Sequence, residues 1–203
     1  MRTCVYVDAF NLYFGCLKRT PFKWLDLWKL CQILLPKNQV LHIKVFTALI
    51  KARPQDPEQP VRQQAYLRAL KTIPQVSIHY GHFLTHTVRM PKAMPPHETV
   101  EVMQTNEKGS DVNLALHFLN DAYRNEFDVG VIVSNDSDLA EAVRMVKRLG
   151  KKVGVVNPHQ RPSQVLLKEC DFFKPIRKSA LASSQLPATL QDEHGTFHKP
   201  LSW

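Results

Sequence analysis

Short apolar runs rich in valine and isoleucine alternate with helix-like segments along this chain. The segment 128–134 (DVGVIVS) is the clearest such run, and 4–7 (CVYV) and 152–156 (KVGVV) share its character. Apolar runs of about four to eight residues that end at polar residues are typical of buried strands. Strands that alternate with helices form α/β folds. The alternation therefore predicts an α/β sandwich with a mainly parallel central sheet.

Periodicity, prolines and glycines place the remaining elements. Helices are predicted over residues 22–35, 61–73, 111–125, 137–149 and 163–169. Further strands are predicted over residues 39–50, 75–84 and 171–176. The proline-rich segment 53–60 leads into the second helix. The segment 85–107 has no clear period, so we expect a long loop or a hairpin there.

The C-terminal residues differ in composition from the rest of the chain. The segment 177–203 is polar and has no helix or strand period, yet it contains Leu186, Leu190, Phe197 and Trp203. We therefore expect residues 1–176 to form one domain and residues 177–203 to form an extension that packs back on it. A length of 203 residues fits one domain of this kind.

The charge of the chain favours a polyanionic partner. Its 27 Lys and Arg residues exceed its 18 Asp and Glu residues, which gives a net charge of +9. Such a surplus favours nucleic acid first and an anionic membrane surface second. No stretch approaches the roughly 18 apolar residues of a membrane span. Asp8 and Asn11 interrupt the apolar N-terminal run, so it makes a poor signal-peptide core. We expect a cytoplasmic protein without membrane contact.

The cysteines and histidines give little indication of a disulfide or a zinc site. Four cysteines are scattered along the chain, at Cys4, Cys16, Cys31 and Cys170. With no C-x-x-C pair among them, we interpret them as buried free thiols in a reducing cytosol. Three histidines lie close together in the sequence, at His79, His82 and His86. They lack a cysteine partner and a standard ligand spacing, so hydrogen-bonded or solvated histidines are favoured over a zinc site.

Acidic and polar residues cluster where predicted strands meet predicted helices. Residues 8–11 (D-x-x-N) follow the first strand, residues 108–111 (K-G-x-D) enter a helix, and residues 134–138 (S-N-D-S-D) follow the strongest strand. Each cluster alone is compatible with a turn or a helix cap. Three clusters at junctions of one sheet favour a functional site instead. Asp138 either belongs to that site or only occupies the first helical turn.

The predicted sheet brings three aspartates to one place. Ligands of parallel α/β sheets bind beyond the carboxyl ends of the strands. If the first strand neighbours the strand at 128–134, Asp8 and Asp136 emerge side by side, and Asp111 can face the same crevice. Carboxylates brought together repel one another, and a hard divalent cation such as Mg²⁺ or Mn²⁺ resolves that conflict. The basic surplus would then hold phosphates over the acidic site.

Other catalytic motifs are absent from the sequence. It contains no G-x-x-x-x-G-K-[ST] phosphate loop, no G-x-G-x-x-G and no G-x-S-x-G elbow. A haloacid-dehalogenase-type phosphatase would need a second aspartate two positions after Asp8, where Phe10 stands. A Toprim-like site would need glutamate after the first strand, where the chain has aspartate.

The three clusters, in this order, resemble the NYN family of PIN-like nucleases, which includes the LabA-type proteins. Further segments look like a bacterial branch of that family: Arg62-Gln63 with Tyr66, Gly81-x-Phe83, residues 88–91 (VRMP) and residues 184–203. The resemblance covers nearly the whole chain and assigns residues 1–176 to an NYN domain. It implies a Rossmann-like, PIN-type three-layer α/β/α sandwich.

The resemblance also implies an activity, namely a metal-dependent endonuclease that acts chiefly on RNA and leaves a 5′-phosphate and a 3′-hydroxyl. By position, Asp8, Asp111 and Asp136 would be ligands of Mg²⁺ or Mn²⁺, with Asp138 as a fourth carboxylate. Asn11 and Ser134 would orient ligands, water or the scissile phosphate. RNA, or another nucleic acid, is the implied partner, and a homodimer stays open by analogy with PIN-like proteins.

Some features of the implied site stay open. PIN-like sites often include an acidic residue from the middle of the chain, and the candidates here are Asp56, Glu101 and Glu107. Arg62 and Lys108 are our choices for phosphate contact, with surface solvation as the alternative. Two other functions compete with a nuclease. One is a non-catalytic or partner-dependent RNA-binding or regulatory module, and the other is a phosphatase for small phosphoesters, which makes little use of the basic surface.

Overall fold

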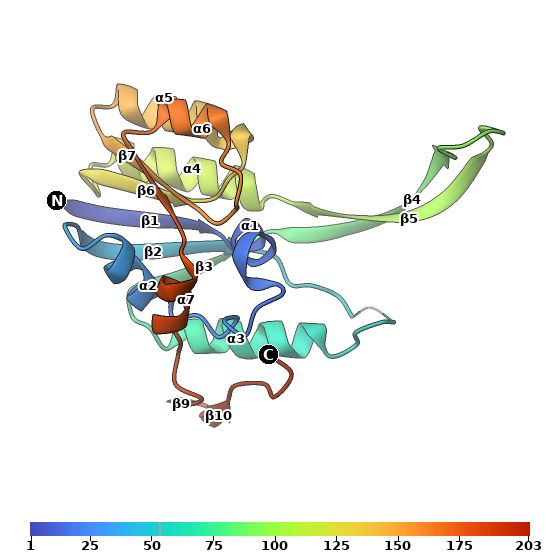
Figure 1. Ribbon diagram of the computed structural model, residues 1–203, viewed down its shortest axis with the longest axis horizontal. Coiled ribbons are helices and arrows are strands. Elements are labelled where there is room, and N and C mark those ends of the chain that lie inside the picture. The colour runs from blue at the N-terminus through green and yellow to red at the C-terminus, as the bar shows by residue number, and fades with distance from the viewer. Residues whose placement is uncertain (53) are drawn as a thin grey trace.

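The central element of the protein is a six-stranded parallel sheet (Figure 1). We describe it from a computed structural model, and the structure describes residues 1–52 and 54–203. The strands, in spatial order, are β3 (Val76–Tyr80), β2 (Gln39–Thr47), β1 (Arg2–Asp8), β6 (Val129–Val133), β7 (Lys152–Asn157) and β8 (Phe172–Pro175). The chain therefore moves outward in one direction from β1 and in the other from β6. This reversal is a topological switch point, where α/β sheets bind ligands.

Helices cover both faces of the sheet, which confirms the predicted α/β/α sandwich. One face carries α1 (Ala9–Leu12), the π-helical turn η1 (Tyr13–Leu17), α2 (Leu27–Leu34), α3 (Gln59–Lys71) and α7 (Lys178–Ser183). The other face carries α4 (Ser110–Tyr123), the 3₁₀ turn η2 (Ser137–Leu139), α5 (Ala140–Arg148) and α6 (Gln164–Glu169).

Strand β1 shows how the sequence builds two cores. Its side chains alternate between the faces, so that Val5 and Val7 join the core under α1, α2 and α3, while Cys4 and Tyr6 join the core under α4 and α5. All four are buried. The Tyr6 hydroxyl donates a 2.6 Å hydrogen bond to Asp121, which also pairs with Lys44 at 2.6 Å. The apolar run is therefore a central strand, as its composition predicts.

Three elements differ from the sequence prediction. Helix α2 begins at Leu27 rather than at residue 22, because the Asp26 side chain caps it by accepting a hydrogen bond from the Lys29 amide. The helical segment Ala9–Leu17 was not predicted at all. The predicted strand 75–84 is divided, since β3 ends at Tyr80 and another strand begins at His82. In the proline-rich segment, residue 53 lies outside the described residues.

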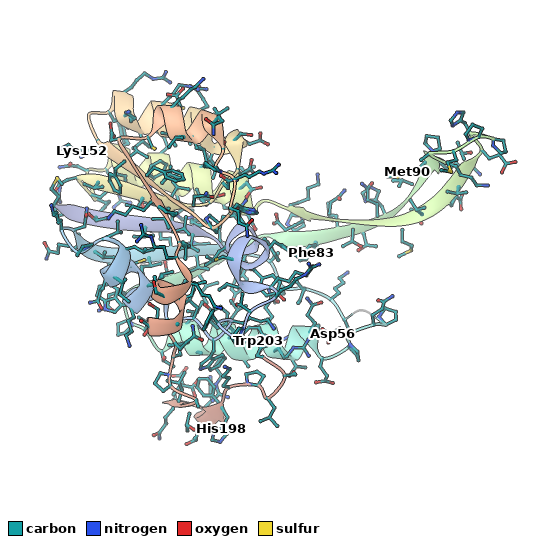
Figure 2. All side chains as sticks on the ribbon, in the orientation of Figure 1. Asp56, Phe83, Met90, Lys152, His198 and Trp203 are labelled. Atoms are coloured by element: carbon teal, nitrogen blue, oxygen red, sulfur yellow. The ribbon has the colours of Figure 1, made fainter. Side chains whose placement is uncertain are left out.

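The segment predicted as a loop or hairpin is a long hairpin. Strand β4 (His82–Pro91) pairs antiparallel with β5 (Thr99–Lys108), and we call residues 82–108 the arm. Figure 1 shows the arm projecting well beyond the sandwich. In Figure 2, Phe83 lies at the root of the arm and Met90 far out along it.

The C-terminal residues lie against α3 and the segment before α2. They form a small hairpin of β9 (Thr189–Asp192) and β10 (Gly195–His198). Phe197 and Leu186 are buried together with Trp24. Arg68 donates two hydrogen bonds to Asp192, at 2.7 and 2.6 Å. The Trp203 ring lies 5.3 Å from the Tyr66 ring, centroid to centroid, and Figure 2 shows it beside α3.

Neither the helices nor the thiols point to a membrane span or a disulfide. No helix within residues 1–52 and 54–203 is long and apolar enough to cross a membrane. All four cysteines are free, with Cys4 and Cys31 buried and Cys16 and Cys170 partly buried. His82 and His86 lie on the arm, whereas His79 stacks on Phe46 with ring centroids 5.0 Å apart. The three histidines therefore do not form a cluster of metal ligands.

A pair of histidines predicts a loss of stability in acid. The rings of His79 and His117 lie 4.3 Å apart, and burial lowers the pKa of both. The unfolded chain therefore binds protons there more readily than the folded chain as the pH falls through about 6.5, so the free energy of unfolding decreases. We expect His117→Gln to lose less stability than the wild type between pH 7.5 and 5.5. Urea unfolding at both values measures this, and equal losses would contradict it.

Candidate functional site

The site lies at the carboxyl ends of β1 and β6, where the strand order reverses. Val7 of β1 stands beside Val133 of β6, so the next residues, Asp8 and Ser134, are neighbours. The Ser134 hydroxyl donates a 3.0 Å hydrogen bond to Asp8 Oδ2, and both side chains are buried. Two of the three sequence clusters therefore meet, as the parallel sheet predicts.

Hydrogen bonds between backbone amides and side chains hold these two clusters in one arrangement. The Asn11 backbone amide donates to Asp8 Oδ1 at 2.9 Å, which makes Asp8 the cap of α1. The Asn11 side chain in turn accepts from the Asn135 amide at 2.9 Å. The Asp136 amide donates to Ser134 Oγ at 3.1 Å. Asn11 and Ser134 thus fix the positions of Asp8 and Asp136 relative to each other.

The third cluster reaches the same place from the root of the arm. Gly109 has φ 95°, a left-handed conformation that glycine adopts without strain, and it turns the chain from β5 into α4. Glu107 accepts hydrogen bonds from the Ser110 amide and hydroxyl, at 3.1 and 2.7 Å. Asp111 follows in the first turn of α4. Asp8, Asp111, Asp136 and Glu107 all line one cleft of about 1050 Å³.

The negative charges of the carboxylates in this cleft raise one another's pKa values. Burial, together with the charges of Asp111 and Asp136, raises the pKa of Asp8 to about 6, against hydrogen bonds from Asn11 and Ser134 that lower it. The pKa of Asp111 is also raised, by burial first and then by the charges of Asp136, Glu107 and Asp138. Four negative charges around one cleft are costly without a positive partner. The donors are all carboxylate oxygens, the ligand type that Mg²⁺ and Mn²⁺ prefer, so the residues fit such an ion.

The described residues do not form a complete metal cage by themselves. Across residues 1–52 and 54–203, no three His, Cys, Asp or Glu side chains stand close enough together to hold a metal ion. Magnesium sites in proteins usually keep several waters and use only one or two carboxylates. An open carboxylate cluster is therefore compatible with an ion that also binds water and substrate oxygens.

The structure separates the three candidates for a mid-chain carboxylate. Glu107 lines the cleft. Asp56 also lines it, but its carboxylate forms an ion pair with Arg62. Glu101 pairs with Arg89 at 3.2 Å out on the arm. Glu107 alone of the three lies in the cleft without a basic partner among the described residues, and its charge acts on Asp111.

The two predicted phosphate contacts fall in different places. Arg62 lines the cleft, its side chain is only 14% exposed, and it forms an ion pair with Asp56. Lys108 stands at the end of β5, opposite His82, and does not line the cleft among the described residues. Asp138 does not line it either, although its charge raises the pKa of Asp111. Asp138 stands in the first turn of η2, which Asp136 caps at 3.0 Å.

Sequence reasoning missed much of the cleft wall. Phe10 of α1 packs on Phe83 of the arm, with ring centroids 5.7 Å apart, and both line the cleft. Three further cations also line it, namely Lys18, Lys23 and Lys51. Tyr13, Tyr66 and Trp203 give one part of it an aromatic lining. The D-A-F-N-L start of α1 carried a capping signal in Asp8, which could have indicated the helix.

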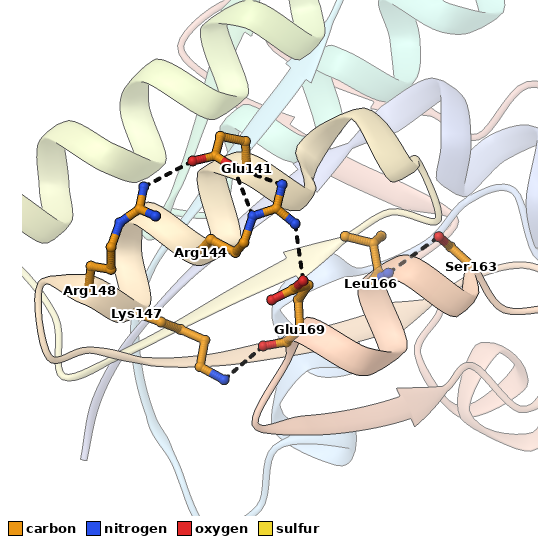
Figure 3. A network of polar contacts seen from close by, with 7 residues as sticks. All are labelled: Glu141, Arg144, Lys147, Arg148, Ser163, Leu166 and Glu169. Atoms are coloured by element: carbon orange, nitrogen blue, oxygen red, sulfur yellow. Dashed lines mark hydrogen bonds and ion pairs between the residues drawn. The ribbon is translucent and has the colours of Figure 1, made fainter.

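A charged network supports the loop beside the site (Figure 3). Arg144 of α5 pairs with Glu141 at 2.7 Å and with Glu169 of α6 at 3.0 Å. Ser163 caps α6, and its amide donates to the Asn135 side chain at 2.6 Å. Exposed ion pairs add little stability. The network links α5 to α6, and the N-terminus of α6 contacts Asn135 through the Ser163 amide.

Gly81 packs closely against Glu107 and Lys108 at the root of the arm, and its replacement tests whether the site depends on this close approach. A Cβ atom there would stand 2.5 Å from Glu107 Oε1 and 2.6 Å from the Lys108 carbonyl oxygen. Gly81→Ala must therefore displace the root of the arm, Glu107 and the start of α4. If the cleft is catalytic, we expect turnover to fall about 10-fold or more, since misplacement of about 1 Å is costly. An unchanged turnover would show that the position of α4 does not matter to the reaction.

Comparisons with known proteins identify the family and the fold of the chain. The sequence profile of the NYN domain matches residues 2–177. The chain is 30% identical to the 6-hydroxy-3-succinoylpyridine 3-monooxygenase HspA of Pseudomonas putida, over all of this chain and 75% of that protein. A crystal structure of a protein of unknown function from Vibrio parahaemolyticus superimposes with a TM-score of 0.58 at 19% identity, over 91% of this chain and 96% of that one, which shows the fold. The chain belongs to the NYN domain family of the PIN-like nuclease superfamily.

Proposed function

We propose that this protein is an endoribonuclease that depends on a divalent metal and hydrolyses phosphodiester bonds in the cleft. The observation that carries the proposal is that Asp8, Asp111 and Asp136, from three separate motifs, line one cleft in a chain of net charge +9. NYN domains are associated with nuclease-type, RNA-related functions, which supports the same reading. Polyanionic RNA suits the basic surface, and an acidic centre within it suits the cleavage of RNA.

The residues of the cleft divide into three roles under this proposal. Asp8, Asp111 and Asp136, with Glu107 beside them, would hold Mg²⁺ or Mn²⁺, which supplies activation of water and neutralisation of developing charge. Asn11 and Ser134 keep Asp8 in place through the hydrogen bonds described above. Lys18, Lys23, Lys51 and Arg62 attract the phosphate backbone to the cleft. Asp138 and Lys108 do not line the cleft in the described part of the chain, and a contact between Lys108 and the phosphate backbone stays a prediction.

A panel of substrates tests the proposal. The purified full chain is incubated with labelled single-stranded RNA, structured RNA, single-stranded DNA and p-nitrophenyl phosphate, each with Mg²⁺, Mn²⁺ or EDTA. The proposal predicts metal-dependent cleavage within RNA and slower reaction of the small ester. Salt-sensitive RNA binding without products would favour a non-catalytic module. Preferred hydrolysis of the small ester would favour a phosphatase.

The relative from Pseudomonas putida favours a second candidate, the oxygen-dependent hydroxylation of a small heteroaromatic acid. That protein is named a monooxygenase for a hydroxypyridine, and the similarity spans all of this chain. The aromatic part of the cleft, with Tyr66 and Trp203 near Arg62, suits a ring that carries a carboxylate. Such a reaction also needs O₂ and a two-electron reductant. The test is the consumption of NADH and O₂ with 6-hydroxy-3-succinoylpyridine, and its failure alongside RNA cleavage would leave the nuclease.

A further inference from the structure

The arm has two faces of different character. Directly opposite residues of paired strands share a face, so the register places odd-numbered residues on one side and even-numbered residues on the other. On the odd side, Phe83, Thr85, Thr105 and Glu107 line the cleft. On the even side stand five apolar side chains, Leu84, Val88, Met90, Val100 and Val102, with Asn106, His86 and Gln104 between them.

From Leu84 to Met90 and from Val100 to Asn106 the even face has no formal charge, whereas Lys108 stands at its root and Lys92 pairs with Glu98 at 2.8 Å beyond its outer end. Leu84 is 48% exposed, Met90 39% and Val100 38%. The whole arm is also neutral, because its three cations, Arg89, Lys92 and Lys108, are matched by Glu98, Glu101 and Glu107. The net charge of +9 therefore lies entirely on the rest of the chain. The stretch between the root and the outer end therefore offers a polyanion no cation to bind, whereas a basic protein can approach it without repulsion.

A second exposed apolar surface lies between α4 and α5. Leu116 is 60% exposed, Tyr123 79%, Met145 37% and Leu149 42%. Together with Leu119 they line a shallow groove of about 490 Å³. We call it the α4–α5 groove. Large apolar side chains gathered in one exposed patch, rather than scattered singly, mark an interaction surface.

The root of the arm shows how its even face is turned relative to the α4–α5 groove. Phe83 on the odd face packs on Phe10 of α1, which covers one face of the sheet. Helices α4 and α5 cover the other face. At its root the even face of the arm is therefore turned toward the side that α4 and α5 occupy. Figure 1 shows the arm extending well past the sandwich.

We propose that two copies of this chain associate by reciprocal exchange of their arms, with the even face of each arm seated in the α4–α5 groove of the other copy. A two-fold axis makes both contacts at once, since each copy offers both surfaces. The neutral arm allows two basic chains to meet. The cleft-lining odd face stays open in both copies. The proposal does not rest on the catalytic activity proposed above.

Buried area favours this exchange over a contact between the two arms alone. An arm of ten residues per strand presents a face of about 34 Å by 10 Å at ordinary strand dimensions. One contact that covers the whole face buries at most about 700 Å² in total, which is below the size of a stable interface. Two such contacts bury at most about 1,400 Å², so the exchange reaches the range of stable interfaces only if both faces are fully covered.

Sedimentation velocity on the full chain, at about 5 to 100 µM, tests the exchange. The wild type is expected to form a dimer in this range. Val88→Glu, on the even face, and Tyr123→Glu, in the groove, are each expected to raise the dimer dissociation constant about 10-fold or more. The matched control is Thr87→Glu, which adds the same charge to the odd face and is expected to leave the dimer intact. Circular dichroism confirms that each variant is folded.

Mixing the two variants distinguishes an exchange from other dimers. Val88→Glu keeps an intact groove and Tyr123→Glu keeps an intact arm, so a mixed pair retains one complete contact. Mixed dimers are expected to form more readily than dimers of either variant alone. A wild type that is monomeric at 100 µM would overturn the proposal. So would a dimer that survives both single variants, or a mixture that associates no better than its parts.

Discussion

Asp8→Asn is expected to lower the rate of RNA cleavage about 100-fold or more, while the protein stays folded. The asparagine oxygen can still accept the hydrogen bond from the Asn11 amide, so the cap of α1 is retained. What is lost is the negative charge between Asp111 and Asp136, on which a divalent ion would depend. Because Asp8 is a buried carboxylate, the variant is expected to be as stable as the wild type or more stable without metal. Single-turnover cleavage and thermal unfolding measure the two effects.

Glu126→Gln is the matched control for this substitution. It removes the same charge from an exposed side chain that pairs with Arg124 at 3.4 Å, far from the cleft lining. We expect its cleavage rate to equal that of the wild type. If Asp8→Asn and Glu126→Gln lower the rate equally, the effect comes from net charge. If neither lowers it, the cleft is not the catalytic site.

Phe118→Ala is expected to have the largest effect on stability, a loss of about 3–5 kcal/mol. Phe118 is fully buried in α4, and its ring lies 4.9 Å from the Tyr6 ring and 5.9 Å from the Phe127 ring, centroid to centroid. The backbone of Gly130 supports it, since a Cβ atom there would stand 2.3 Å from Phe118 Cε2. Removal of the ring leaves a cavity that this rigid surrounding cannot fill. Urea unfolding at pH 7.5 measures the loss.

Val112→Ala is the control on the same helix. Its side chain is 62% exposed, so the substitution is expected to change the free energy of unfolding by less than about 0.5 kcal/mol. A loss below about 1 kcal/mol for Phe118→Ala would contradict the packing described for α4, because a buried phenylalanine typically contributes more.

The core of the site could be predicted because it follows from local sequence and one topological rule. The apolar runs at 4–7 and 128–134 identify two buried strands, and each is followed by an acidic cluster. Parallel neighbours end at the same edge of the sheet, so Asp8 and Asp136 had to meet if the strands were adjacent. Asp111 could be placed once the start of α4 was predicted, because it lies in the first turn of that helix.

The rest of the cleft could not be predicted because it depends on contacts between distant segments. Arg62 and Asp56 pair only because the turn before α3 folds back on the helix. Lys108 belongs to a predicted motif, yet it stands on the opposite face of β5 from Glu107, which lines the cleft. Trp203 lines the cleft from the last position of the chain. The arm forms because β4 pairs with β5 along their whole length. The sequence periodicity of 82–108 does not indicate that this hairpin leaves the sandwich.

The central claim is that the carboxylate cleft is a metal-dependent centre that cuts RNA. The most direct measurement uses the purified full chain, stripped with EDTA, and a single-stranded RNA labelled at both ends. The products are followed as Mn²⁺ is added back. The account predicts no cleavage in EDTA and, with Mn²⁺, internal cuts that leave a 5′-phosphate and a 3′-hydroxyl. Equal cleavage in EDTA, or no cleavage with any divalent metal, would contradict it.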